Sequence, residues 1–201
     1  MYLSSSHAPR EIRKFSEEVK IIIMLLNPVD MVYSIFCTGF YPNARGLGIE
    51  RYATYPGVNK LVRNAHHVER YVEVFGPENV HVIVHDDLSA SPARTYLDTC
   101  SFLGIAGSFR PDFVVHAPAR APRFQTLRDA VAEPASLSRR VAHHILPAPL
   151  RALLRAATWR FATMPPKPLD SAIRRRLQET FHTETEDLSV VLSRDLSTWG
   201  S

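Results

Sequence analysis

One stretch near the N-terminus combines the features of a ligand-binding turn. It runs from Lys20 to Ser34 and reads K-I-I-I-M-L-L-N-P-V-D-M-V-Y-S. The apolar run 21–26 has the length of a strand, while Asn27 and Pro28 suit a helix N-cap and a first helical position. In open α/β sheets, ligands bind at the turn that follows the carboxyl end of a strand. The stretch therefore predicts a strand, a tight binding turn and a helix.

Apolar residues on both sides of the turn predict how it is held in place. The run 21–26 is apolar at every position, which is typical of a strand with both faces covered inside a parallel sheet. After the turn, the spacing of one buried helix face is kept by Val29, Val32, Tyr33 and Phe36.

The same stretch resembles the 3′-phosphate-binding segment of sulfotransferases that use PAPS (3′-phosphoadenosine 5′-phosphosulfate). In that family an apolar strand is followed by R-N-P or R-D-P and later by R-x-x-S, and the first Arg and the Ser hold the 3′-phosphate. Asn27, Pro28 and Ser34 match this pattern. Leu26 stands in place of the first Arg and Met31 in place of the second. The resemblance implies nucleotide binding by Asn27 and Ser34, without the cationic part of the family site.

Two further blocks resemble bacterial and glycan-modifying sulfotransferases. Tyr71–Ile105 contains Y-V-E-V-F-G-P-E-N-V-H-V-I-V-H-D-D-L-S-A-S-P and then S-F-L-G-I. The ending R-D-L-S-T-W is similar to the family's terminal G-R-D-L-x-x-W. The resemblance covers nearly the whole chain. It implies an α/β fold: a partial parallel sheet of the P-loop-like sulfotransferase fold with a helical C-terminal half.

Periodicity and turn residues predict the remaining elements, and strands alternating with helices at these lengths favour parallel pairing. We expect helices at 8–15, 61–75, 92–103, 137–145 and 150–161, a strand at 80–84, an irregular loop at 41–59, and a final helical region that begins at Asp170.

The phosphosulfate cradle of the family, P-K-x-G-T-[ST] or similar, has no counterpart in this sequence. In the family it lies on the first strand, N-terminal to the 3′-phosphate segment. We therefore expect residues 1–201 to form a single sulfotransferase-like domain that is N-terminally incomplete. Two explanations stay open: an incomplete copy of an enzyme, or a decayed or repurposed relative, which Leu26 favours.

Other candidate site residues come from the resemblance. The proline-rich run H-A-P-A-R-A-P-R-F stands where the family has a loop that closes over the nucleotide. Arg123 fits the basic position of that loop best and Arg120 second; the alternative is a solvated loop arginine. His7 lies broadly where cytosolic members carry a catalytic base; the alternative is a terminal His that faces water. No Cys/His spacing suggests a metal.

The charge of the chain is unevenly distributed. The range 110–176 holds 13 Arg and Lys against 4 Asp and Glu, so its net charge is +9 and that of the remainder is −5. A basic half suggests an anionic partner. Two cysteines, no signal pattern and no apolar run of transmembrane length favour a cytoplasmic protein, although one disulfide stays an alternative.

The function expected from these features is sulfuryl transfer from PAPS, a co-substrate, to a hydroxyl or amine of a carbohydrate or small-molecule acceptor, without a metal. The alternative is a non-catalytic relative that binds an anionic ligand or partner. Nucleic-acid binding would rest on charge alone, because no groove-reading or stacking motif accompanies it.

We predict that the 201-residue chain by itself transfers no sulfuryl group. Without the cradle, the phosphosulfate lacks the backbone N–H groups and the cation that hold it in line for attack. The measurement is sulfate transfer from PAPS to a panel of hydroxyl and amine acceptors, and transfer above a protein-free control would contradict the prediction.

Overall fold

The computed structural model describes residues 3–16, 18–38, 40–44, 46–114, 121–122, 163–164 and 167–200 of the chain. Two compact units are present: Met1–Tyr33, Tyr41–Val114 and Leu169–Ser201 form the larger, and Ser34–Phe40 and Val115–Pro168 form the smaller. The single-domain organisation stays a prediction. The helices expected at 137–145 and 150–161 lie outside the described residues. Within the described ranges, no helix has both the length and the apolarity that crossing a membrane requires.

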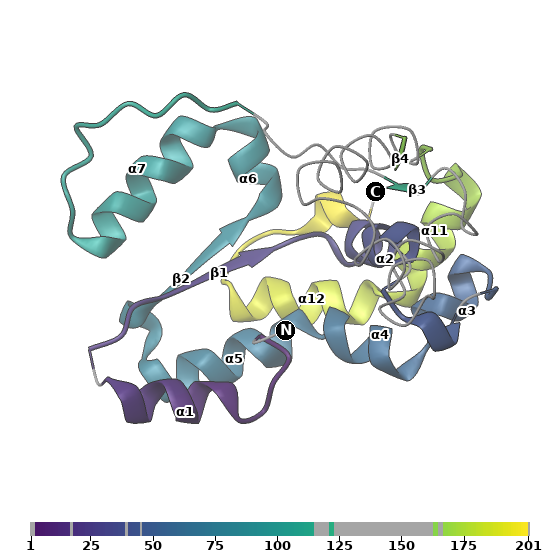
Figure 1. The fold of residues 1–201 in the computed structure, drawn as a ribbon, viewed down its shortest axis with the longest axis horizontal. Helices are drawn as coiled ribbons and strands as arrows, with labels where there is room; N and C mark the ends of the chain where they lie inside the picture. The colour runs from purple at the N-terminus through teal and green to yellow at the C-terminus, as the bar shows by residue number, and fades with distance from the viewer. Residues whose placement is uncertain are drawn as a thin grey trace, which may run out of the picture. The chain divides into compact units, whose positions relative to one another are not determined.

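Two parallel strands form the sheet of the larger unit (Figure 1). β1 (Ile21–Leu25) pairs with β2 (Val80–Val84), with Ile21 opposite Val80 and Leu25 opposite Val84. Both predicted strands and their parallel pairing are confirmed. The smaller unit contains a short antiparallel pair, β3 (Ala121–Pro122) and β4 (Thr163–Met164).

Helices make up most of the rest of the described chain. The α-helices are α1 (Ala8–Phe15), α2 (Pro28–Thr38), α3 (Ile49–Ala53), α4 (Pro56–Val62), α5 (Asn64–Phe75), α6 (His85–Ala90), α7 (Pro92–Leu103), α11 (Ser171–Thr180) and α12 (His182–Val191). Short 3-10 turns occur at Pro42–Ala44, Pro77–Asn79 and Ser197–Trp199.

Several helix boundaries follow directly from local sequence. Ser91 is the N-cap residue of α7, and Gly104 ends that helix in the left-handed region at φ 72°. Asp170 caps α11, because its Oδ1 accepts hydrogen bonds from the backbone N–H groups of Ala172 and Ile173. These predicted boundaries are confirmed.

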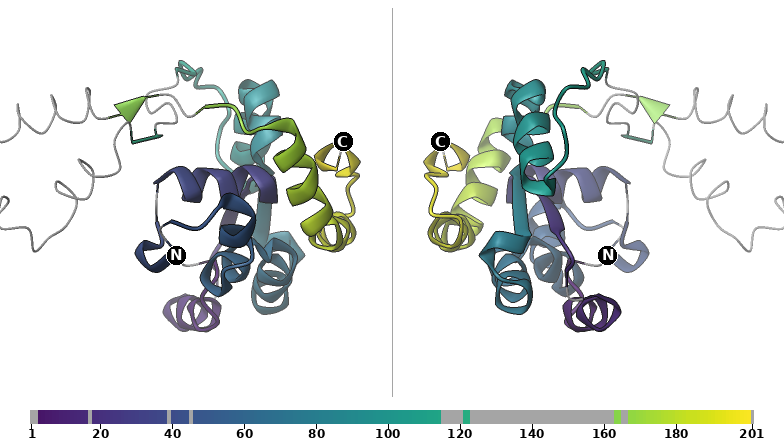
Figure 2. Two further views of the ribbon diagram at one scale, coloured as in Figure 1. Left: turned by 90° about the vertical axis from the view of Figure 1, so that its right-hand side faces the viewer. Right: turned by 90° about the vertical axis from the view of Figure 1, so that its left-hand side faces the viewer.

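The core of the larger unit lies on one face of the sheet. α5 and α12 run side by side in Figures 1 and 2 and pack against each other. The buried cluster joins both strands, α5, α12 and the C-terminal segment through Ile23, Leu25, Val68, Tyr71, Phe75, Val84, Leu188, Leu196 and Trp199. α5 and the C-terminal segment, which are far apart in the sequence, therefore cover this face together.

The prediction that both faces of β1 are covered is wrong. Ile23 and Leu25 are buried, but Ile22 is 44% and Met24 is 53% exposed. The reason is that β1 is an edge strand of the described sheet, and α7 packs against its neighbour β2. A strand that is apolar at every position can therefore have only one of its two faces covered.

The prediction of an irregular loop at 41–59 is also wrong. It contains η1 (Pro42–Ala44), α3 and the start of α4, because Tyr52, Ala53 and Val58 are buried and tertiary packing offsets the turn-forming residues. The helix predicted at 61–75 is interrupted at Arg63, whose backbone has ψ 62° between α4 and α5.

Two carboxylates that follow β2 hold the C-terminal segment. Arg194 forms a two-pronged ion pair with Asp87, in which Nη2 donates to Oδ1 at 2.7 Å. The indole Nε1 of Trp199 donates to Asp86 Oδ2 at 2.7 Å. The family-like blocks H-D-D-L and R-D-L-S-T-W are therefore in direct contact.

We predict that Asp87→Asn destabilises the protein at neutral pH but not in strong acid. Hydrogen bonds from Arg194 lower the pKa of the Asp87 carboxyl below its ordinary value. The contribution of the pair is therefore complete above the ordinary Asp pKa and is lost as pH falls through the lower folded-state pKa. Since the two side chains are 41% and 44% exposed, the loss at neutral pH should be about 0.2–1 kcal/mol.

Urea unfolding of the wild type and the variant across this pH range is the measurement. Asp98→Asn is the matched control, because its i,i+4 partner Arg94 lies 3.7 Å away on the same exposed helix face and connects no distant segments. An equal deficit for Asp87→Asn at neutral and acid pH would contradict the linkage.

Candidate functional site

The turn after β1 is built around the Asn27 side chain. β1 ends at Leu25, Leu26 is half-buried, and Asn27 is 7% exposed. The Oδ1 atom of Asn27 accepts a hydrogen bond from Val29 N at 2.9 Å, and its carbonyl accepts one from Met31 N at 2.8 Å. Asn27 is thus the predicted N-cap of α2, and its side-chain oxygen is engaged in holding the helix start.

Ser34, the other matched residue of the turn, is exposed on α2. It follows Asn27 by seven residues along the same helical segment. The structure therefore places Asn27 at the strand–helix turn and Ser34 farther along the helix, as the sequence predicted. Their roles as ligands stay predictions.

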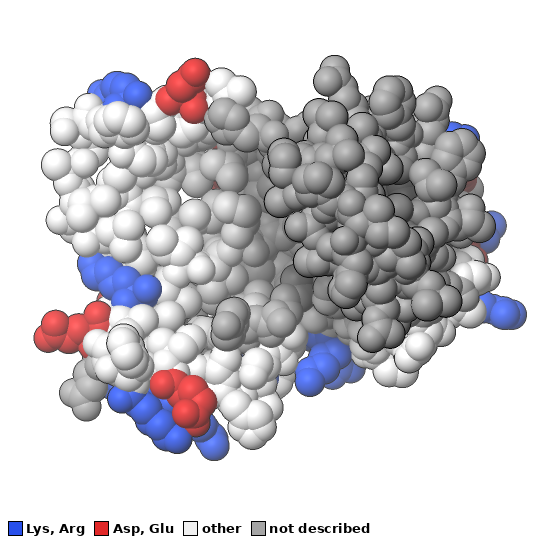
Figure 3. Space-filling model, viewed as in Figure 1, with Lys and Arg blue, Asp and Glu red and all other residues white. Residues whose placement is uncertain are grey.

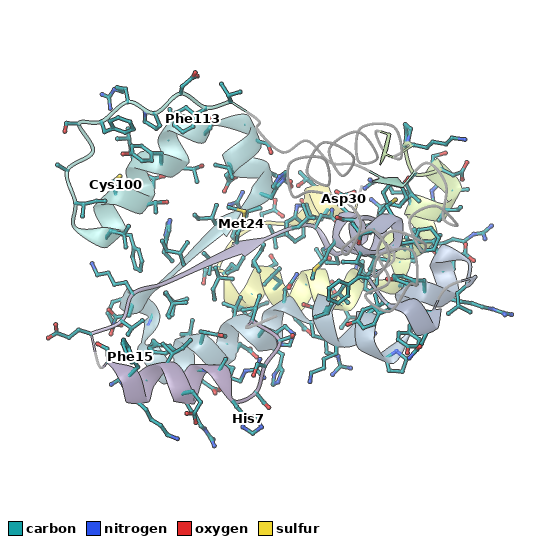
Figure 4. The ribbon with its side chains drawn as sticks, viewed as in Figure 1. His7, Phe15, Met24, Asp30, Cys100 and Phe113 are labelled. Atoms are coloured by element: carbon teal, nitrogen blue, oxygen red, sulfur yellow. The ribbon has the colours of Figure 1, made fainter. Side chains whose placement is uncertain are left out.

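An ion pair lies over the first turn of α2. Asp30, the third residue of the helix, accepts a hydrogen bond at 2.5 Å from Nη2 of Arg174 in α11. On the same helix, Arg176 donates to Glu50 of α3 at 2.8 Å. Figure 4 shows Asp30 at the end of α2 nearest to β1.

Sequence reasoning missed the Asp30–Arg174 pair. The first-turn position of Asp30 is a local signal, because a negative charge there stabilises the positive end of the helix dipole. No local signal identifies its partner, which lies 144 residues away along the chain. Arg174 was predicted only as a member of the basic range 110–176.

That the basic range 110–176 binds an anionic partner stays a prediction, because most of the range lies outside the described residues. Arg174 and Arg176, which are described, face carboxylates of α2 and α3. Figure 3 shows acidic and basic side chains next to each other at its lower left, where α1 lies in Figure 1. The two described arginines of the range 110–176 named here are likewise matched by carboxylates.

His7, the predicted base, does not lie at this turn. His7 is exposed and occupies the N-cap position of α1, where its backbone N–H donates to Ser5 Oγ at 3.4 Å. In Figure 4 the His7 ring lies at the bottom of the view, below α1 and well away from Asp30. Arg120 and Arg123 lie outside the described residues.

A separate groove of about 620 Å³ lies between the α4–α5 and α11–α12 pairs and contains none of the predicted site residues. Glu184 on its wall accepts a hydrogen bond from Ala65 N at 2.8 Å and so caps α5. Burial raises the pKa of the Glu184 carboxyl. Among the described residues, no three His, Cys, Asp or Glu side chains gather as they would around a metal ion.

Comparison with known proteins identifies relatives of this architecture. A family model described as "Sulfotransferase domain" matches residues 2–116, more than half of the chain. The crystal structure of a sulfotransferase from Alicyclobacillus acidocaldarius is similar, with a TM-score of 0.64 and 21% sequence identity. The alignment covers 100% of this chain and 65% of that one, so this chain spans about two thirds of its length. No curated protein matches.

We predict that Asn27→Ala destabilises the protein by about 0.5–2 kcal/mol, because the N–H of Val29 loses its capping acceptor. Asn27→Asp is the matched control: its carboxylate keeps the acceptor and should preserve stability. Chemical denaturation of the three proteins is the measurement. Equal stability of the Ala variant and the wild type would show that the cap contributes nothing.

Proposed function

Because the chain belongs to the sulfotransferase family, we propose that it serves the transfer of a sulfuryl group from PAPS to a hydroxyl or amine of a carbohydrate or small-molecule acceptor. The observation that carries the proposal is the family match over residues 2–116, which includes β1 and the capped start of α2. PAPS acts as co-substrate in this proposal, and no metal takes part.

Each candidate residue has a definite task in the proposed reaction. The Ser34 hydroxyl donates a hydrogen bond to the 3′-phosphate, and Asn27 fixes the turn beneath it. Arg123, with Arg120 as the second candidate, closes a loop over the nucleotide. His7 is the candidate base that takes the acceptor proton as the oxygen attacks the sulfur. The nucleotide and the acceptor are the partners, and the proposed location is the cytoplasm.

The alternative function is a non-catalytic relative that binds an anionic ligand or partner. Leu26 in place of the family's phosphate-binding Arg favours it. The coding sequence upstream of Met1 separates the two functions. An in-frame cradle segment supports the enzyme, and a stop codon supports the non-catalytic relative.

We predict that Leu26→Arg tightens the binding of adenosine 3′,5′-bisphosphate on the order of tenfold or more. The 3′-phosphate carries about two negative charges, and a bidentate guanidinium makes charge-assisted bonds that a Leu side chain cannot make. Adding Ser34→Ala should remove part of the gain, since it deletes one neutral hydrogen-bond donor.

Calorimetric titration of the wild type, Leu26→Arg and Leu26→Arg/Ser34→Ala is the measurement. Leu26→Lys is the control, because an ammonium group supplies the charge without the bidentate geometry and should give a smaller gain. Equal affinity of all four proteins would mean that this turn is not a phosphate site.

A further inference from the structure

Three consecutive arginines of α11 have three different surroundings. Arg174 bonds to Asp30 on the first turn of α2, and Arg176 bonds to Glu50 of α3. Arg175 is exposed and makes no hydrogen bond or ion pair with any residue in the described ranges. Arg174 therefore contacts the first turn of α2, whereas its neighbour Arg175, which has the same side chain, does not.

The guanidinium of Arg174 contacts the first turn of α2, which directly follows Leu26, the position that lacks a cation. Side chains of a helix tilt toward its N-terminus, so the Asp30 carboxylate and its bound guanidinium lie over the first turn of α2. Leu26 and the Asn27 cap immediately precede that turn. Leu26 offers no donor, and the oxygen of Asn27 is already engaged with Val29.

Both members of the ion pair remain accessible. The Arg174 side chain is 37% exposed and the Asp30 side chain is 39% exposed. A guanidinium has five N–H donors, and the described residues account for one hydrogen bond from Arg174, through Nη2 to Asp30. An anion approaching from solvent can therefore meet donors of Arg174 without displacing a buried contact.

We propose that Arg174 is an anion-binding residue at this turn and that its ligand is the 3′-phosphate of the nucleotide. Its guanidinium would replace the one that the family's Arg supplies at the position occupied here by Leu26. This inference rests on the proposed function. Asp30 holds Arg174 over the turn when no ligand is bound, and its carboxylate then competes with the phosphate for the same cation.

The competition gives the two members of the pair opposite effects on ligand binding. Removing Arg174 removes the attraction, whereas replacing the Asp30 carboxylate by an amide keeps an oxygen acceptor for Arg174 and removes a repelling charge. An ion pair with a purely structural role predicts the same sign for both changes, because either substitution weakens the ion pair. Opposite signs for these two variants, together with an Arg175→Ala variant that binds like the wild type, therefore identify Arg174 as a ligand-binding residue.

The experiment is calorimetric titration of adenosine 3′,5′-bisphosphate into the full chain carrying Arg174→Ala, Asp30→Asn or Arg175→Ala. Arg175→Ala is the matched control, since it removes the same charge from the next position of α11. We expect Arg174→Ala to weaken binding about tenfold or more, Asp30→Asn to tighten it, and Arg175→Ala to stay within about twofold of the wild type. Thermal unfolding of each variant verifies that it is folded, and Arg174→Lys, with partial loss expected, replaces the Ala variant if that one is not.

Equal losses of affinity in the Arg174→Ala and Arg175→Ala variants would overturn the inference. Such a result would mean that any positive charge on this part of α11 attracts the nucleotide, without specific contact by Arg174. Weakening by both Arg174→Ala and Asp30→Asn would also overturn it, in favour of a structural ion pair. If the wild type binds no nucleotide while Leu26→Arg does, Arg174 does not replace the missing guanidinium, and the inference fails although the proposed function survives. If neither binds, both fail.

Discussion

Burial of one face of the β1–β2 pair is the constraint on which the larger unit depends. Two strands alone are marginally stable in water and need a layer packed against them. Ile23 and Leu25 of β1 and Val84 of β2 meet that need by packing with α5, α12 and Trp199. A slip of one residue in β1 would turn Ile22 and Met24 inward and Ile23 and Leu25 outward. The buried face therefore fixes the point at which β1 ends.

Because β1 ends at a fixed point, the strand–helix turn is fixed as well. Leu26 follows directly, and the Asn27 cap starts α2 at Pro28. The cap satisfies a backbone donor that would otherwise remain unbonded in a buried turn. The charge and hydrogen-bonding groups at the turn therefore depend on the residue at position 26 and on side chains from other elements that contact the first turn of α2.

Local features of the fold could be read from the sequence because their causes are local. Asn27 and Asp170 predicted helix starts, and the strand at 80–84 followed from its periodicity. Coverage of Ile22 and Met24 could not be read, because it depends on whether another element packs there.

In the candidate site, too, features with a local cause could be predicted and features that depend on distant residues could not. The position of Asn27 at the turn was predictable from the N-P dipeptide after an apolar run. The pairs Asp30–Arg174 and Asp87–Arg194 join residues 144 and 107 positions apart, and a single sequence has no signal for such pairs. These pairs form only because the C-terminal segment packs against the strand ends in the folded protein.

The C-terminal segment also binds carboxylates at the carboxyl ends of the two strands. Asp30 follows β1, and Asp86 and Asp87 follow β2. Each of these carboxylates is bound by a donor from the last part of the chain, namely Arg174, Trp199 or Arg194. Three unpartnered carboxylates on neighbouring strand ends would repel any phosphate. The C-terminal segment therefore completes the core and also places a cation on two of these carboxylates, Asp30 and Asp87, and a neutral indole donor on the third, Asp86.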